Sequence, residues 1–470
     1  MRQARPPIRY EEGYFIPSVP IPDQRAPEEW NIWDHPRSLI TIARNPLESS
    51  AAWQYDNLIN QFPLFSTFFT QISDPDMIRY CFVENADNYR MQPIRQRILK
   101  PILREGLVTA EGESWKRARH ALTPLFTPKH VTSFAKSMAE TTLREMPILL
   151  KDGATVKFSE IMPSFTYLIL SDALFSGQIS GDREDVLKLV ANALKFLGRP
   201  DPLDILAAPD WIPRLTKRPG LRAIQKLRDL IQAGYQNRVT MKSRGEILPD
   251  DFLTLIMDVA DETGAPLSDD EIEDHLLTFI GAGHETTARA LTWLFYLLDN
   301  DDNARERLEV EVDALNIGLP PDSWGEHLPW TKACLEESMR LYPPAPIVTR
   351  EAINEDHFAD RTIPKGGVAM INLWILHRHN KLWERPNAFN PSRFFGGARK
   401  EIGLYQYLPF GLGPRVCIGQ RFAVQEALIM IALLARNYRF EYVADEPPWP
   451  RMNVTVQPEN GMPVRILKRK

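Results

Sequence analysis

A single cysteine in a glycine-rich segment is the residue of this sequence whose surroundings most clearly predict chemistry. The segment FGLGPRVCIG runs from Phe410 to Gly419, and Cys417 lies just before a predicted helix. Glycines permit tight turns and a close approach of the backbone to a bulky group. Backbone N–H groups and the positive end of a helix stabilise a thiolate, the form that a soft, redox-active iron binds. The pattern predicts a metal-binding thiolate, and the alternative is a buried structural cysteine in a turn.

A second candidate lies where two glycines interrupt an apolar run. Residues 281–286 read GAGHET, and each glycine within a helix costs about 1 kcal/mol relative to alanine. We therefore expect some group to approach the backbone closely at this point. Thr286 can donate a hydrogen bond to a preceding carbonyl and bend the helix. The alternative is a simple kink with a surface-facing Glu285.

Two further spacings place charged or aromatic side chains on one helix face. Glu337 and Arg340 are three residues apart, and Trp115 and Arg119 are four apart, so the members of each pair are neighbours on a helix. Taken alone, both spacings are weak evidence, because such pairs are common on amphipathic helices.

Three predicted helices must position these residues. Ser268 and Glu271 form a candidate capping box, and the pattern after it predicts a helix of roughly 30 residues, or about 45 Å. A second helix is expected from about Trp330 to Tyr342, ended by two prolines. A third begins after Gly419.

Short β segments are expected between Ile347 and Asn372, with a turn at residues 364–367. Residues 29–80 are left without an assignment. The expected fold class is mainly α with a small β portion, in one domain over residues 1–470.

Composition narrows the class of protein. The chain has 470 residues, a net charge of -5 and 3 cysteines. This charge gives no signal for nucleic acid, and so few cysteines predict no disulfide framework. We expect no secretion signal and no membrane span, because no apolar stretch reaches about 18 residues. A cytoplasmic protein is the expectation.

The cysteine segment resembles the haem-binding signature of the cytochrome P-450 superfamily: Phe, two residues, Gly, one residue, Arg, one residue, Cys, one residue, Gly. Every position of this signature is filled, and the resemblance extends from about Asp74 to the C-terminus. It implies a haem b cofactor (iron protoporphyrin IX), held between the long central helix and the cysteine loop. The residues that fill the signature are Phe410, Gly413, Arg415, Cys417 and Gly419.

The same resemblance implies roles for the other candidates. Cys417 would be the iron ligand, with Phe410 packed near its sulfur. Glu285 and Thr286 match an acid–alcohol pair that supplies protons beside the oxygen site. The expected propionate-binding residues are Trp115, Arg119, Arg350 and Arg415, and the expected structural triad is Glu337, Arg340 and Arg393. Cys81 and Cys334 match no ligand position and are expected to be packing residues.

The implied activity is insertion of one oxygen atom from O2 into a C–H or C=C bond. Six apolar positions match the family's substrate pocket and suggest a lipophilic substrate, such as a fatty acid or terpenoid. A peroxide-driven peroxygenase and a non-enzymatic haem sensor or electron carrier remain as alternatives. The six positions are Val108, Phe279, Ala282, Ala345, Ile347 and Val454.

Electrons are expected from a separate ferredoxin or flavodoxin and its reductase, because no flavin or nicotinamide module follows Lys470. Lys116, Arg117 and Arg421 are expected near the cysteine side and would form a basic docking surface. The alternative is an ordinary solvated face.

Overall fold

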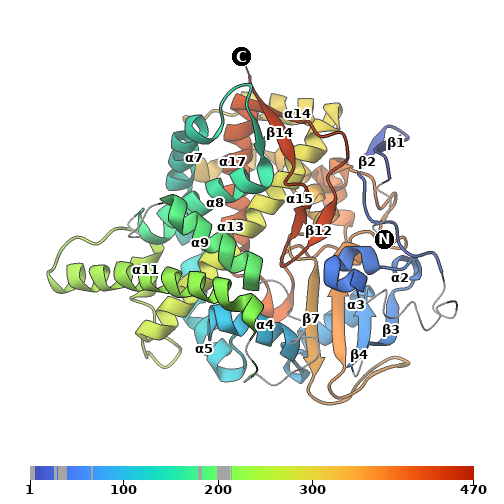
Figure 1. The fold of residues 1–470 in the computed structure, drawn as a ribbon, viewed down its shortest axis with the longest axis horizontal. Coiled ribbons are helices and arrows are strands. Elements are labelled where there is room, and N and C mark those ends of the chain that lie inside the picture. Colours follow the sequence, from blue (N-terminus) through green and yellow to red (C-terminus); the bar gives the residue numbers. More distant parts are fainter. Residues whose placement is uncertain are drawn as a thin grey trace.

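A long helix at the centre of the molecule organises the computed structural model of this protein (Figure 1). The structure describes residues 6–25, 29, 40–64, 67–177, 183–197, 212 and 214–469. The central helix, α13, spans Asp269–Asp299. Ser268 and Glu271 form the predicted capping box, each side chain bonding to the other's backbone. Almost every residue after the first turn of α13 is apolar or buried, as expected of a helix enclosed by others.

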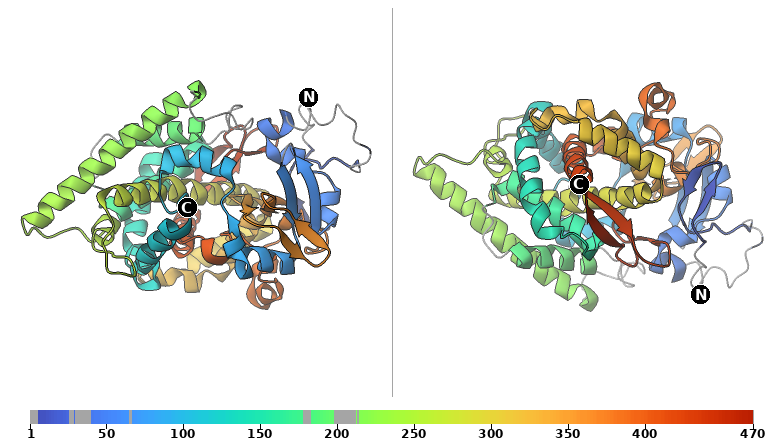
Figure 2. Two further views of the ribbon diagram at one scale, coloured as in Figure 1. Left: turned by 90° about the horizontal axis from the view of Figure 1, so that it is seen from below. Right: turned by 90° about the horizontal axis from the view of Figure 1, so that it is seen from above.

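Helices surround α13 on most sides (Figures 1 and 2). The neighbours that contact it most are α8 (Phe158–Phe175), α15 (Pro329–Leu341) and α11 (Arg218–Ser243). The third predicted helix is α17 (Gln420–Asn437). The other helices are α2 (Trp53–Asp56), α3 (Pro75–Arg79), α4 (Pro93–Leu103), α5 (Gly112–Leu122), α6 (Pro128–Ser133), α7 (Ala135–Leu149), α9 (Arg183–Leu197), α12 (Phe252–Ile256), α14 (Asp302–Ala314) and α16 (Leu373–Leu376).

A five-stranded sheet lies on the side of the molecule away from α11 (Figures 1 and 2). Its order is β3-β4-β10-β7-β5, with β4 and β10 parallel and the other neighbours antiparallel. Two of its strands therefore come from the segment that the sequence left unassigned. The bounds are β3 (Ile59–Leu64), β4 (Thr67–Ile72), β5 (Tyr89–Arg90), β7 (Ile347–Ala352) and β10 (Val368–Asn372).

Four smaller sheets complete the β portion. The largest has the order β11-β14-β6 and joins the C-terminus to the chain before α8. The others are two-stranded. Their strands are β1 (Arg9–Glu11), β2 (Tyr14–Ile16), β6 (Thr155–Lys157), β8 (Asp356–Phe358), β9 (Arg361–Ile363), β11 (Tyr438–Tyr442), β12 (Pro450–Met452), β13 (Val456–Pro458) and β14 (Pro463–Lys468).

The expected fold class, mainly α with a small β portion, is confirmed. The largest hydrophobic cluster of the described residues includes residues from Phe15 near the N-terminus to Ile466 near the C-terminus, and two smaller clusters accompany it. Among the residues that the structure describes, no helix is both long and apolar enough to cross a membrane.

Candidate active site

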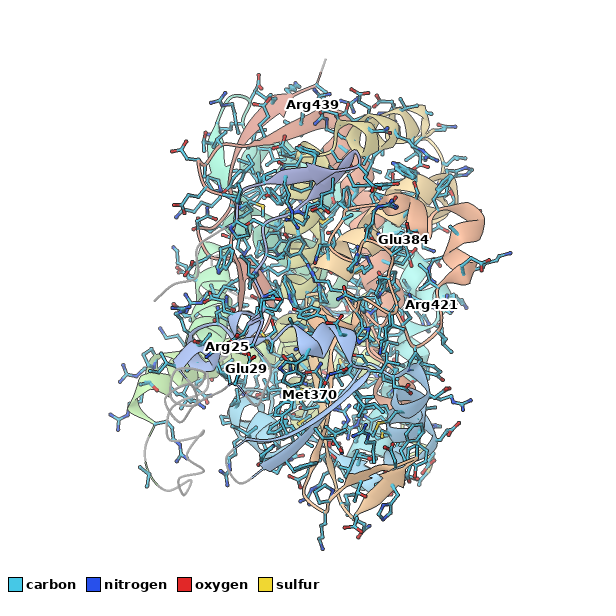
Figure 3. All side chains as sticks on the ribbon, turned by 90° about the vertical axis from the view of Figure 1, so that its right-hand side faces the viewer. Arg25, Glu29, Met370, Glu384, Arg421 and Arg439 are labelled. Atoms are coloured by element: carbon cyan, nitrogen blue, oxygen red, sulfur yellow. The ribbon has the colours of Figure 1, made fainter. Side chains whose placement is uncertain are left out.

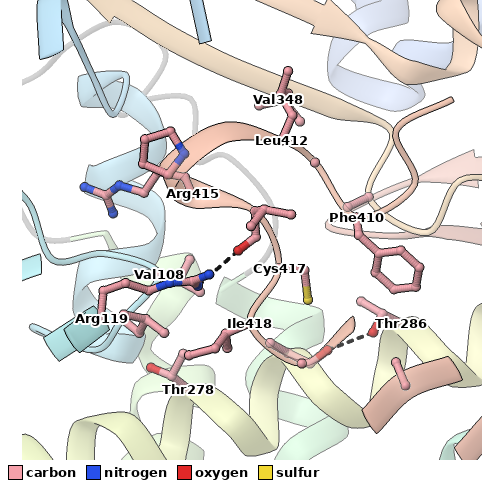
Figure 4. A pocket seen from close by; sticks show the side chains of 18 of the residues that line it. Val108, Arg119, Thr278, Thr286, Val348, Phe410, Leu412, Arg415, Cys417 and Ile418 are labelled. Carbon is pink, nitrogen blue, oxygen red and sulfur yellow. Dashed lines mark hydrogen bonds between the residues drawn. The ribbon is translucent and has the colours of Figure 1, made fainter. Parts of the chain in front are cut away.

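A cavity of about 730 Å³ lies between α13 and the loop that carries Cys417. Its walls also include residues of α4, α5 and β7. Figure 4 shows the Cys417 sulfur pointing from the loop toward α13. The volume is ample for a cofactor or ligand of several rings.

The loop around Cys417 is held by backbone hydrogen bonds. The Cys417 N–H donates to the Phe410 carbonyl oxygen at 2.9 Å, and the Val416 N–H donates to Gly413 at 3.1 Å. Gly413 has φ +65°, and a Cβ there would lie 2.1 Å from the Phe82 carbonyl oxygen. No side chain fits so close to another backbone. The sequence analysis predicted that these glycines allow another group to approach the backbone closely. Gly413 does allow such an approach, and the group that approaches it is the backbone of Phe82.

The Cys417 side chain is accessible, and its accessible surface belongs to the cavity wall. Burial raises the pKa of the Cys417 thiol, whereas the Gly419 N–H and the charge of Arg119 act in the opposite direction. The predicted backbone donor to sulfur is therefore present. Burial nevertheless has the larger effect on the free thiol. A bound metal cation would be the group that favours the thiolate.

Three predicted arginines and one tryptophan meet at the cavity wall. Arg119 donates to the Val416 carbonyl oxygen at 3.0 Å (Figure 4), and Arg350 donates to the carbonyl oxygen of Thr349 at 2.8 Å. The Arg415 guanidinium lies 4.2 Å from the ring centroid of Trp115. Burial lowers the pKa of Arg119 and of Arg415, and lowers that of Arg350 to about 10.

Two charged residues of this wall were missed by the sequence analysis. Glu111 accepts a hydrogen bond from Arg415 at 2.7 Å. Arg95, on α4, lines the cavity as well, and burial alone lowers its pKa. Neither belongs to a motif, so only the tertiary structure brings them to the site.

These charges allow a test of whether the cavity fits haem. Among the residues that the structure describes, Arg95, Arg119 and Arg350 form no ion pair with a carboxylate. Guanidinium groups that are partly withdrawn from solvent without a counter-charge are costly, so the wall favours a ligand that carries negative charge. A thiol that faces the same cavity supplies a soft ligand for iron. The residues present therefore fit a flat, apolar, dianionic iron cofactor.

Thr286 lines the cavity from α13. Its hydroxyl donates to the Ala282 carbonyl oxygen at 2.9 Å, the predicted bond to the preceding turn (Figure 4). Glu285 lies elsewhere, outside the cavity wall. One of its carboxylate oxygens accepts hydrogen bonds from Arg289 at 3.1 Å and from Thr455 at 3.0 Å. The predicted acid–alcohol pair is thus adjacent in sequence, while only the alcohol faces the cavity.

The two glycines of α13 have different surroundings. A Cβ on Gly283 would lie 3.0 Å from a methyl group of Leu170, whereas one on Gly281 would meet only Leu103 at 3.9 Å. Gly283 therefore permits close packing of α8 against α13. The helix continues without interruption through both positions.

Four of the six predicted substrate-pocket residues line the cavity: Val108, Phe279, Ala282 and Ala345. Ile347 and Val454 do not, and Val454 is exposed. On β7, Val348 and Arg350 face the cavity instead. Successive side chains of a strand point to opposite faces, so Ile347 lies on the other face from Val348.

The predicted structural triad forms a buried network. Arg340 donates to Glu337 through Nε at 2.7 Å and through a terminal nitrogen at 2.8 Å. Arg393 approaches Glu337 to 3.5 Å. Glu337 and Arg340 have no exposed surface. A bidentate arginine–carboxylate pair of this kind is geometrically specific as well as strong.

The network reaches the cysteine loop through one histidine. Arg340 donates to the His377 carbonyl oxygen at 2.7 Å. Burial lowers the pKa of His377 to about 3, so its ring is neutral and its Nε2 accepts the Leu408 N–H at 3.0 Å. Leu408 lies two residues before Phe410. The triad therefore fixes the start of the loop indirectly.

Glu426, on α17, is a buried carboxyl that the sequence analysis did not identify. Its side chain is 1% exposed, and one oxygen has no hydrogen-bond partner. Burial raises its pKa to about 8, despite a hydrogen bond with Thr287. Thr287 in turn lines the cavity. At neutral pH Glu426 is therefore protonated, and Thr287 connects it to the cavity.

The Glu426→Gln variant should gain stability relative to wild type as the pH rises. Between about pH 4.5 and 8 the folded protein keeps a proton that the unfolded chain has lost. Wild-type stability therefore falls across this window, by up to about 1.4 kcal/mol per pH unit. Glutamine does not titrate. Unfolding free energies of both proteins at pH 5.5 and pH 7.5 measure the effect, and a difference independent of pH would show that Glu426 is ionised.

The expected basic docking surface is not an array of unpaired cations. Lys116 pairs with Glu113 at 2.9 Å. Arg117 pairs with both Asp261 and Glu271 and is only partly accessible. Lys116 and Arg421 are both exposed, and Arg421 lies near the right-hand edge of the molecule in Figure 3. Because nearby acids reduce the net charge at Lys116 and Arg117, the basic docking surface stays a prediction.

Cys81 and Cys334 are buried free thiols, as expected of packing residues. Cys81 also lines the cavity, and the Tyr89 hydroxyl lies 3.5 Å from its sulfur. Burial raises the pKa of the Cys81 thiol to about 12.

Comparison with known proteins gives one consistent family. A family model for cytochrome P450 matches residues 55–464. Cyclooctatin synthase of Streptomyces melanosporofaciens is 30% identical over 399 residues, which cover 83% of this chain and 84% of that protein. Leukotriene-B4 omega-hydroxylase 3 of Mus musculus is 28% identical over 398 residues, covering 78% and 74% respectively.

The fold agrees with a solved structure. The crystal structure of the cytochrome P450DA heme domain superposes with a TM-score of 0.76 at 23% identity, covering 88% of this chain and 90% of that one. At this identity the likeness shows a shared fold.

Proposed function

Because this chain belongs to the cytochrome P450 family of haem-dependent monooxygenases, we propose that it hydroxylates or epoxidises a lipophilic small molecule with O2 and electrons from a separate donor protein. One observation carries the proposal. The Cys417 thiol, three guanidinium groups without carboxylate partners and the Thr286 hydroxyl all face one cavity. A fatty acid or a terpenoid is the substrate class that we propose.

We assign the cofactor contacts to residues of the cavity wall. Cys417 would hold the iron through its sulfur, with Phe410 packed beside it. Arg119 and Arg350 would bind the propionates, and Trp115 would support Arg415 at the same edge. When bound, the haem supplies the iron centre at which oxygen is activated, a chemistry that thiolate ligation favours.

The apolar wall would select the substrate and exclude water. Val108, Phe279, Ala282 and Ala345 have no polar side-chain atoms and line the same cavity as Thr286. Such a wall binds by burying apolar surface, with a strength that grows with the area covered. It therefore supports a lipophilic substrate. One relative reported above is named for omega-hydroxylation, which is compatible with attack on a C–H bond.

Thr286 would govern the supply of protons at the cavity. Its hydroxyl proton is held by the Ala282 carbonyl, so its oxygen lone pairs are free to accept a hydrogen bond from water in the cavity. A water held in this way has a defined direction for proton donation. Glu285 would resupply this proton only after releasing Arg289 and Thr455.

Thr286→Ala should separate reductant consumption from product formation. Without the Thr286 hydroxyl, the water that donates the proton is no longer held in one direction. We therefore expect more of the reduced oxygen to leave as hydrogen peroxide. We expect reductant to be consumed at a comparable rate, with several-fold less product and correspondingly more peroxide. The measurement is the ratio of reductant, peroxide and product with a substrate that shifts the Soret band.

Thr286→Ser keeps a hydroxyl and serves as the matched control, for which we expect most of the product yield to return. Coupling in Thr286→Ala equal to that of wild type would remove Thr286 from proton supply.

The electron source is tested with the purified, haem-loaded chain. We expect product only when a ferredoxin or flavodoxin and its reductase are added. Product formed with NADPH and no partner would contradict the need for a separate donor. Product formed with hydrogen peroxide alone, at the same rate as with the complete system, would favour the peroxygenase alternative.

A further inference from the structure

A buried carboxyl group faces the central helix from the helix that follows the Cys417 loop. Glu426 lies on α17, and Ala423 and Ala427 of the same helix line the cavity. Burial is the main cause of the raised pKa of Glu426, and no charged side chain contributes to it. Among the residues that the structure describes, its partner is the Thr287 hydroxyl, and one carboxyl oxygen has no partner. A buried carboxyl that forms no ion pair costs stability, which points to a role other than folding.

Thr287 connects this carboxyl to the cavity. Its side chain lines the cavity wall, as does that of Thr286. The Thr287 hydroxyl donates to the Gly283 carbonyl oxygen at a long 3.4 Å, whereas the corresponding bond of Thr286 measures 2.9 Å. The hydroxyl proton of Thr287 is therefore held more weakly and can turn toward water in the cavity. Because a hydroxyl accepts one hydrogen bond while it donates another, a proton can pass from Glu426 through Thr287.

Glu285, the acid expected from the sequence, is placed differently. It lies outside the cavity wall, and one of its oxygens accepts hydrogen bonds from Arg289 and Thr455. The Glu285 carboxylate has to leave both partners before it can reach the cavity. Glu426 keeps its place and needs only the rotation of one hydroxyl.

We infer that Glu426, acting through the Thr287 hydroxyl, supplies one of the protons that oxygen insertion consumes. This inference rests on the proposed function. Insertion of one oxygen atom of O2 into a C–H bond releases the other atom as water, which takes up two protons and the two electrons of the donor protein. In each turnover the Glu426 O–H bond breaks, Thr287 receives that proton, and the proton of Thr287 passes to a water molecule in the cavity. The carboxylate then recovers a proton by the reverse route from water that enters between turnovers, because burial disfavours its charge.

Infrared spectroscopy of the haem-loaded protein tests this path without turnover. At neutral pH the difference spectrum between wild type and Glu426→Gln should contain the C=O stretching band of a protonated carboxyl. In D2O this band shifts as deuterium replaces the proton. Thr287→Val should slow the exchange several-fold, because the path runs through the hydroxyl. Thr287→Ser is the matched control and should exchange like wild type, with each variant measured against the same protein carrying Glu426→Gln.

Turnover with a substrate that shifts the Soret band tests the role in the reaction. Glutamine keeps the size of Glu426 but has no proton to transfer. Glu426→Gln should therefore form product at least about tenfold more slowly, with haem content and the dissociation constant of the substrate unchanged. Thr287→Val should show a similar loss, and the double variant no further loss, because the two groups act in one path. Glu426→Asp keeps a carboxyl and should regain part of the rate.

A missing carboxyl band, or equally fast exchange in Thr287→Val and Thr287→Ser, would overturn the path. Product formation in Glu426→Gln at the wild-type rate, or a greater loss in Glu285→Gln, would overturn the role of Glu426 and leave the proposed function intact. Loss of haem from Glu426→Gln with full activity per haem would reduce Glu426 to a packing role. A wild type that forms no oxygenated product with a complete electron-transfer system would refute both the proposed function and this role.

Discussion

Arg340→Ala should lower the free energy of unfolding by about 3–5 kcal/mol and reduce haem retention, although Arg340 contacts no substrate. All five N–H donors of Arg340 are used: two bond to Glu337, and the others bond to the carbonyl oxygens of His377, Pro386 and Ala388. Removing this side chain leaves the buried Glu337 carboxylate with the Asn390 N–H at 2.8 Å and, as its counter-charge, Arg393 at 3.5 Å. The measurement is denaturant unfolding together with the haem-to-protein ratio after purification.

A control pair uses the neighbouring residue of α15, Glu336, which pairs with Arg399 at 3.0 Å. The Arg399 side chain is 41% exposed and that of Glu336 is 15% exposed, whereas Arg340 and Glu337 have no exposed surface. Because solvent screens a partly exposed pair, Arg399→Ala should cost clearly less stability than Arg340→Ala. If both variants unfold at the same denaturant concentration as wild type, the triad does not fix the loop. Loss of stability in Arg340→Ala with full haem occupancy would limit its role to the fold.

Cys417→Ala should abolish oxygen insertion and weaken haem binding, because the side chain proposed to hold the iron is removed. Among the cysteines that line the cavity, Cys81 is the other candidate thiol. Its pKa is raised to about 12 by burial, so it is a poor source of thiolate. The measurements are product formation with a complete electron-transfer system and haem content under the same conditions.

Cys81→Ala tests the rival thiol directly and should keep both haem and product formation near wild type. Loss of product in Cys81→Ala with retention in Cys417→Ala would exchange the roles of the two residues. Retention in both would mean that neither thiol is the ligand.

The sequence predicted the candidate site best where its residues lie in one short segment. The loop around Cys417 contains its own glycines, its arginine and the helix that follows it, so local spacing is sufficient to identify it. The long helix was predicted with its cap because Ser268 and Glu271 are three residues apart. The triad was found through resemblance, since Arg393 lies far along the chain from Glu337.

The sequence did not predict which residue each charged side chain of the site binds. Nothing in the spacing shows that Glu285 turns toward Arg289, or that Glu111 lies against Arg415. The orientation of Ile347 depends on the register of β7, and a shift of one residue reverses which face a side chain occupies. Burial of Glu426 likewise follows from the packing of α17 against its neighbours.

The first strands of the five-stranded sheet were missed for a related reason. β3 and β4 pair with each other, and β4 then pairs with β10, about 300 residues later in the chain. Strand residues that find their partners so far away carry little local signal, because β propensity depends on neighbouring strands.

The absorption spectrum of the reduced, carbon-monoxide-bound wild-type protein tests the central claim most directly. A cysteine thiolate ligand would shift the Soret band of this complex far to the red of that of a histidine-ligated haem. We predict the red-shifted band in wild type and its loss in Cys417→Ala. A wild-type band at the position typical of histidine ligation, or a red-shifted band that persists in Cys417→Ala, would contradict the assignment of Cys417 as the iron ligand.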